Sequence, residues 1–154
     1  MMGIAHFSKA GLVLILMMAV IGGCSGDSGP QPIDEAVDVC ASCNMSVSDG
    51  PFAAEWVQRD GEVLKFDDIG CLAGYLNNND TDGEAYVRDF HSKEWIRTDQ
   101  AFFAESEVHT PMNSGLVAFQ GEDRLQAFIR EETGAKETTW EEILRHARDE
   151  EAKH

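Results

Sequence analysis

The sequence predicts an α+β domain in which two small, related strand–strand–helix units pack together and a C-terminal helix follows. Three observations predict this class. Short apolar segments bounded by turn residues alternate with segments of helical periodicity. A capping box begins a last amphipathic segment near the C-terminus. The chain also resembles itself weakly at an offset of 53 residues, with these matches: Phe66 with Phe119, Leu72 with Leu125, Tyr75 with Phe128, and Leu76 with Ile129.

The composition limits the class of protein and of partner. A length of 154 residues is room for one domain of ordinary size. The 28 acidic and 12 basic residues give a net charge of −16, which argues against nucleic acid as a partner. Such acidity would either steer the protein toward a basic patch on a partner or reflect adaptation to high salt.

The first two dozen residues are typical of a targeting segment. Residues 11–21 carry no charge, and as a helix they would cover only about half of a ~30 Å hydrocarbon layer, which suits a signal peptide better than a permanent span. Two glycines before Cys24 resemble a lipobox. We therefore predict a signal peptide over residues 1–23, a lipid on Cys24, and a flexible linker over residues 24–38. The protein would then be anchored on the extracytoplasmic face of a membrane, where at least one of its three remaining cysteines stays unpaired.

The first unit is predicted from a hairpin and a helix. Residues 52–57 and 62–66 read as strands, and the Asp-Gly pair between them is a hairpin signal because glycine accepts positive φ. Asp67 or Asp68 caps a helix whose apolar residues recur at i, i+3, i+4 and i+7, and residues 77–80 end it.

Two further strands are predicted to complete the first half. These are residues 85–90 and 94–97, joined by a short turn. Asp99 is then expected to cap one helical turn through Phe103, and a loop that holds Met112 follows.

The second half repeats the pattern. Residues 116–119 predict a strand and residues 122–132 a helix. A capping box over residues 139–142 starts the C-terminal helix. The folded domain is predicted to span residues 39–147, and the polar tail of residues 148–154 is expected to fray.

The stretch Cys40-Ala41-Ser42-Cys43-Asn44-Met45 carries the most chemical information. If residues 43–45 are extended, the Cys43 thiolate and the Met45 thioether point to one side. Two soft sulfur donors favour Cu(I), whereas zinc prefers thiolates and imidazoles in fours. Met112 would supply a third sulfur. Cys40 and Cys43, taken alone, would equally suit a redox pair, a local disulfide or half of a zinc site.

The sequence gives less support to other candidate ligands. His109, three residues before Met112, is an auxiliary candidate. Cys71, at the start of an apolar helix, is typical of a buried thiol. Three histidines are expected at the surface: His91, His146 and His154.

At these residues the sequence resembles the NosL family. Six motifs follow in the family's order: the lipobox at Cys24, Cys-x-x-Cys-x-Met at residues 40–45, residues 66–72, residues 89–96, Pro111-Met112, and Ala118-Phe119. The resemblance implies two related ββαβ units and a membrane-anchored Cu(I) chaperone that supplies the copper-sulfide centre of nitrous oxide reductase. It puts the copper ligands at Cys43, Met45 and Met112, and Cys40 lies where a second cysteine is common in the family.

Two other functions remain open at the level of sequence. One is an extracytoplasmic thiol-disulfide oxidoreductase that uses Cys40 and Cys43, and the other is a structural zinc-binding module. A carbon-mercury lyase related by fold finds no support in particular residues. The chain carries no nucleophile motif, phosphate-binding glycine loop or hydrolytic His/carboxylate array, so we expect a metal-binding protein and no enzyme.

Overall fold

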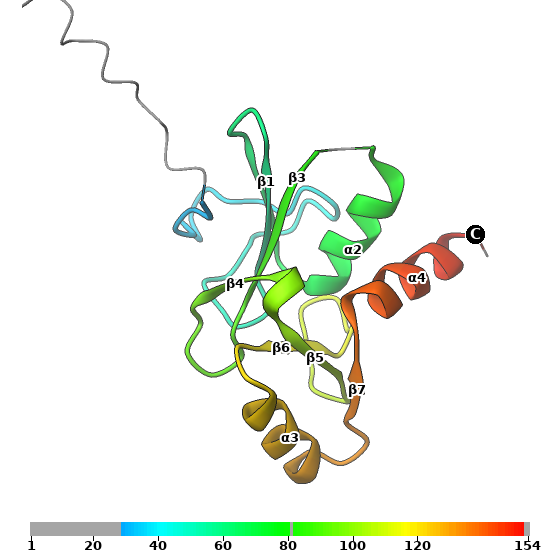
Figure 1. Ribbon diagram of the computed structural model, residues 1–154. Helices are drawn as coiled ribbons and strands as arrows, with labels where there is room; N and C mark the ends of the chain where they lie inside the picture. Colours follow the sequence, from blue (N-terminus) through cyan, green and yellow to red (C-terminus); the bar gives the residue numbers. More distant parts are fainter. Residues whose placement is uncertain (1–28, 81, 153–154) are drawn as a thin grey trace, which may run out of the picture.

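The computed structural model describes residues 29–80 and 82–152 of the chain (Figure 1). The predicted signal peptide and Cys24 lie outside the described residues. Two small antiparallel sheets form the framework, one of four strands in the order β2-β1-β3-β4 and one of three in the order β6-β5-β7. In the part of the chain that is described, no helix has the length and apolar character to cross a membrane.

The first unit joins a hairpin to a helix and two more strands. Its elements are β1 Ala54–Gln58, β2 Val63–Phe66, α2 Ile69–Asn78, β3 Gly83–Arg88 and β4 Trp95–Arg97. The predicted hairpin is confirmed, with Gly61 at a φ of 93° in its turn. Asp68 caps α2, as predicted, because its side chain accepts a hydrogen bond from the backbone N–H of Gly70 at 2.7 Å.

The second unit has the same topology as the first. Its elements are β5 Phe102–Glu105, β6 Leu116–Phe119, α3 Glu122–Glu131 and β7 Lys136–Thr138. In both units the first strand lies between the second strand and the strand after the helix, as β2-β1-β3 and β6-β5-β7. The two related ββαβ units are therefore confirmed, and β4 is an additional edge strand of the first.

One local prediction was wrong, and one strand was not predicted. The helical turn expected through Phe103 is a 3-10 turn limited to Thr98–Gln100, called η2 here, and Phe103 belongs to β5, where it pairs with Ala118 and Thr138. Burial of its ring, which is 1% exposed, outweighs the local helix signal. The strand that was not predicted is β7. It is a three-residue edge strand with two exposed polar side chains, so it has no apolar alternation that would indicate a strand.

The C-terminal helix α4, Trp140–Glu151, begins at the predicted capping box. The N–H of Glu142 donates to Thr139 Oγ1 at 3.2 Å, and the Glu142 carboxylate accepts from the N–H of Thr139 at 3.3 Å. The helix continues past residue 148, where a fraying tail was expected. Helices α2 and α4 lie side by side (Figure 1), joined by a 2.7 Å hydrogen bond from Asn77 Nδ2 to the carbonyl of Leu144.

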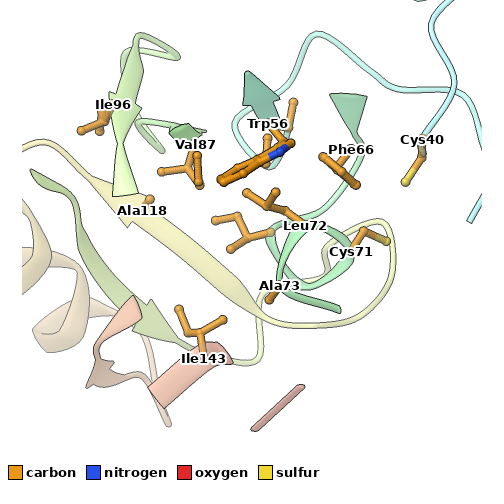
Figure 2. Packing of buried hydrophobic residues seen from close by; sticks show 14 of the residues in the cluster. Cys40, Trp56, Phe66, Cys71, Leu72, Ala73, Val87, Ile96, Ala118 and Ile143 are labelled. Carbon is orange, nitrogen blue, oxygen red and sulfur yellow. The ribbon is translucent and has the colours of Figure 1, made fainter. Parts of the chain in front are cut away.

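The larger core lies between the first sheet and helices α2 and α4. Trp56, Phe66 and Leu72 fill its centre, and Ile143 closes it from α4. Figure 2 shows Cys40 and Cys71 at one end of this core, near Phe66. A smaller cluster around Phe119, Leu125 and Phe128 forms the core of the second unit. The start of α2, where Ile69, Cys71 and Leu72 are buried, therefore belongs to the larger core.

Candidate metal centre

The Cys40–Met45 segment is a closed turn. An isolated bridge joins Val39 to Ser46 just outside it. The N–H of Cys40 donates to the carbonyl of Met45 at 2.7 Å, and the N–H of Asn44 donates to the carbonyl of Cys40 at 2.9 Å. Asn44 has a φ of 61°, in the left-handed region that asparagine tolerates better than most residues. Residues 43–45 are therefore not extended, so the condition under which Cys43 and Met45 would point to one side is not met.

Three cysteines and one aspartate meet where this turn contacts the start of α2. One potential ligand atom from each of Cys40, Cys43, Asp67 and Cys71 lies within 4.8 Å of all the others. The turn docks on β2 through a 2.8 Å hydrogen bond from the N–H of Ala41 to the carbonyl of Lys65. All three cysteines in the described part of the chain are free thiols. The group has the donor types of a metal site.

Hydrogen bonds make the thiols of Cys40 and Cys71 unequal in acidity. The hydrogen bond from the Cys71 thiol, with further ones from the backbone N–H groups of Cys43, Asp67 and Ser42, lowers the pKa of Cys40 to about 6 against the opposing effect of burial. The same hydrogen bond raises the pKa of Cys71, which keeps its proton. Of the three thiols, Cys40 is therefore the one whose thiolate is most favoured.

Cys43 stands on the more open side of the cluster. Its Sγ lies 3.5 and 3.7 Å from the two carboxylate oxygens of Asp67, to which the thiol donates. Burial is the main cause that raises the pKa of Cys43, and the neighbouring Cys40 thiolate adds to it. A cation that displaced this proton would meet a thiolate and a carboxylate together.

Asp68 ties the loop that carries Met112 to the start of α2. Its buried carboxylate accepts hydrogen bonds from the hydroxyls of Thr110 at 2.6 Å and Ser114 at 2.5 Å. It also accepts from the backbone N–H groups of Met112 at 3.0 Å and Gly70 at 2.7 Å. Consecutive aspartates thus serve two sides of one site, since Asp67 contacts the thiols and Asp68 holds the Met112 loop.

A cavity of about 520 Å³ adjoins both sides. Cys71, Met112 and Ser42 contribute to its wall, and α4 closes it with Ile143 and His146. His146 is exposed at the surface, as expected, and its side chain borders this cavity. A side chain from another molecule that entered this cavity would therefore meet both Cys71 and Met112.

The structure places the predicted ligands at different depths. Cys40 and Cys43 lie in the cluster, and Met112 lies in the adjoining loop. Met45 and Met112 are each 43% exposed, and His109 is exposed in the loop before Met112. No histidine belongs to the group of potential ligands found among residues 29–80 and 82–152.

Two residues of the cluster were not predicted as ligands. Cys71 was interpreted as a buried thiol, and it is indeed only 8% exposed. Asp67 was interpreted as a possible helix cap, a position that Asp68 takes. One feature of the sequence could have indicated them: Asp67 and Cys71 both flank the predicted start of the same helix. A turn of residues 40–45 that docked on this helix start would contact both.

Comparisons with known proteins identify the group to which this fold belongs. Residues 31–147 match a family model described as NosL. No curated protein matches the chain. Among solved structures, the copper chaperone NosL from Shewanella denitrificans is similar, with 22% sequence identity and a TM-score of 0.66 over 75% of this chain and 95% of that one. At this identity, the likeness to the solved structure establishes a shared fold.

Proposed function

Because the chain belongs to the NosL family, we propose that it is a copper chaperone, which binds Cu(I) as cargo and passes it to a client protein. The observation that carries this proposal is the meeting of Cys40 and Cys43 beside a loop that Asp68 holds in place with Met112. The name of the solved relative, a copper chaperone, agrees with it.

The donor set favours Cu(I) as the cargo. Cys40 and Cys43 supply thiolate sulfur, and Met45 and Met112 supply thioether sulfur from the two loops that border the cluster. His109 is an auxiliary ligand. Soft donors of this kind select a soft monovalent ion, whereas a neutral thioether adds little for zinc.

Release of the ion follows from partial exposure of the site. The buried Cys40 thiolate holds one side of the ion, while the thioethers of Met45 and Met112 are 43% exposed. An incoming ligand of the client enters through the adjoining cavity before a thioether leaves. Copper is then exchanged between proteins without entering solution as the free ion.

The client and the location come from the family. We propose the apo form of nitrous oxide reductase as the acceptor, whose copper-sulfide centre the chaperone supplies. Cys24 carries the lipid that anchors the protein on the extracytoplasmic face of a membrane, and the residues between Cys24 and the folded domain are the tether. The net charge of −16 favours a basic patch on the client.

A thiol-disulfide oxidoreductase is the second candidate. The pKa of Cys40, about 6, supports it because a thiolate in a Cys-x-x-Cys segment is the reactive species in disulfide exchange. This activity would survive Met45→Leu and Met112→Leu, whereas copper binding would weaken in both variants.

Competition for Cu(I) tests the proposal. The full chain, under reducing conditions, is titrated with Cu(I) against a chelator of known affinity, and an equal mixture of copper and zinc is offered in parallel. We expect copper to be retained, and Cys43→Ser to lose affinity while Ser48→Ala, an exposed change nearby, does not. Retention of zinc in preference to copper, or unchanged affinity in Cys43→Ser, would contradict the proposal.

A further inference from the structure

The cysteine turn, which docks on the first unit, has a copy that lies between β3 and β4 and docks on the second unit. Residues 89–94 repeat residues 40–45 at an offset of 49. The N–H of Asp89 donates to the carbonyl of Glu94 at 2.9 Å, and the N–H of Lys93 donates to the carbonyl of Asp89 at 2.9 Å. Lys93 has a φ of 60°, nearly that of Asn44. Both backbone hydrogen bonds and the left-handed residue of the cysteine turn therefore recur.

The two turns also dock in the same way. The N–H of Phe90 donates to the carbonyl of Ala118 on β6 at 2.8 Å, as that of Ala41 does to Lys65 on β2. Each turn thus lies against the second strand of one unit, next to the start of that unit's helix.

The side chain that opens each turn is held by equivalent backbone groups. Asp89 accepts from the N–H groups of His91 at 3.0 Å, Ser92 at 2.7 Å and Gln120 at 2.8 Å. Cys40 accepts from the three equivalent N–H groups, those of Ser42, Cys43 and Asp67. Both units therefore build the same anion-holding pocket, which takes a carboxylate in one unit and sulfur in the other.

The units differ in what faces this anion. In the second unit, Arg124 Nη1 lies 3.4 Å from Asp89 Oδ1 and balances its charge. The equivalent position on α2 is Cys71, which gives Cys40 only a hydrogen bond. The nearby Lys65 is paired with Asp38 instead. Among the described residues, no ion pair joins Lys or Arg to Asp67, so the first pocket has anionic groups without a fixed cation.

We propose that Cys71 is a third sulfur ligand, and that a soft monovalent cation held by Cys40, Cys43 and Cys71 takes the place that the Arg124 guanidinium has in the second unit. The choice of Cu(I) as this cation rests on the proposed function. On binding, the thiol protons of Cys71 and Cys43 leave to solvent, and each sulfur uses the freed electron pair to bind the ion. The first unit would thus bind an exchangeable cation at the place where the second unit has the fixed charge of the Arg124 side chain.

Cys71→Ser tests the ligand assignment. Serine keeps the size of the side chain and removes the soft donor. We expect Cu(I) affinity to fall by at least about tenfold, because changes even outside the ligand shell of metal sites cost ten- to a hundredfold. The X-ray absorption spectrum of the copper-loaded protein should lose one sulfur neighbour. The matched control is Arg124→Gln, which removes the fixed cation of the second unit and should leave copper affinity unchanged.

Cys71→Arg tests the equivalence of the two cations directly. The position borders the cavity, which gives a longer side chain room. We expect the metal-free variant to melt above metal-free wild type, and to gain no further stability from Ag(I), used as a redox-inert probe. A merely disruptive substitution would lower the melting temperature, so the sign of the change is diagnostic.

The outcomes separate this inference from the proposed function. If wild type binds Cu(I) and Cys71→Ser binds it equally well with the same sulfur count, the inference is wrong and the chaperone proposal stands. Wild-type copper affinity in Cys71→Arg would also overturn the inference. A wild-type chain that does not retain Cu(I) would contradict the proposed function itself.

Discussion

The thiol side and the thioether side of the site differ in depth. Cys40 is 0% exposed and Cys71 8%, whereas Met45 and Met112 are each 43% exposed. The thiols are fixed by hydrogen bonds from α2 and from their own turn, and the thioethers reach the surface from loops. The thiol ligands are therefore held in position by hydrogen bonds inside the protein. The thioether ligands, which bind the ion more weakly, lie at the surface, where a client can reach them. Affinity should depend mainly on the thiol side, and exchange on the thioether side.

The largest effect on copper affinity should follow a change at Cys40. We expect Cys40→Ser to weaken Cu(I) binding by more than about a hundredfold, because loss of a thiolate ligand exceeds the ten- to hundredfold cost of changes outside the ligand shell. Chelator competition measures the affinity.

A second variant separates binding from folding. Cys40→Asp copies Asp89, so its carboxylate can accept the hydrogen bonds that Cys40 accepts. We expect it to fold and to lose copper. If either variant keeps wild-type affinity, the thiol side does not hold the ion.

The largest effect on stability should follow Asp68→Ala. This change leaves the hydroxyls of Thr110 and Ser114 and the backbone N–H of Met112 without their buried acceptor, and we expect a loss of about 3 kcal/mol of unfolding free energy. Denaturant titration of the metal-free chain measures it. Asp80→Ala, at an exposed carboxylate after α2, is the control. A loss confined to copper affinity, with unchanged stability, would mean that Asp68 does not fix the Met112 loop.

Much of the fold could be predicted because its signals are local. The Asp-Gly turn, the Asp68 cap and the capping box at Thr139 each depend on residues within a few positions. The repeat was visible because matched apolar residues, such as Phe66 and Phe119, fill the same place in two cores.

The site could be predicted only in part, since its contacts join distant segments. Cys71 is 31 residues from Cys40 in the sequence, and nothing local shows that the turn docks on α2. The left-handed Asn44 was missed because residues 40–45 carry no glycine to mark it. The duplicated turn was hidden because it conserves backbone hydrogen bonds while its opening residue changes from Cys40 to Asp89.

Changes on the thioether side should be smaller. We expect Met112→Leu to weaken Cu(I) binding by about tenfold, or about 1.4 kcal/mol, and to leave unfolding free energy nearly unchanged because the swap conserves volume. Met45→Leu should weaken binding in the same direction. Transfer of copper to an acceptor, followed by stopped-flow absorbance, should change more in these variants than equilibrium affinity does. A loss as large as that of Cys40→Ser would remove the distinction between the two sides.

The smallest effect is expected at His109. Its side chain is exposed, and it precedes Met112 by three residues in a loop whose backbone Asp68 already holds. As an auxiliary ligand it would add one more donor to an ion that sulfur already binds, so His109→Ala should change Cu(I) affinity by less than about threefold, under 1 kcal/mol. His91→Ala, at an exposed histidine in the turn between β3 and β4, is the matched control. Should His109→Ala weaken binding as much as Met112→Leu, the exposed side would be a mixed nitrogen and sulfur site.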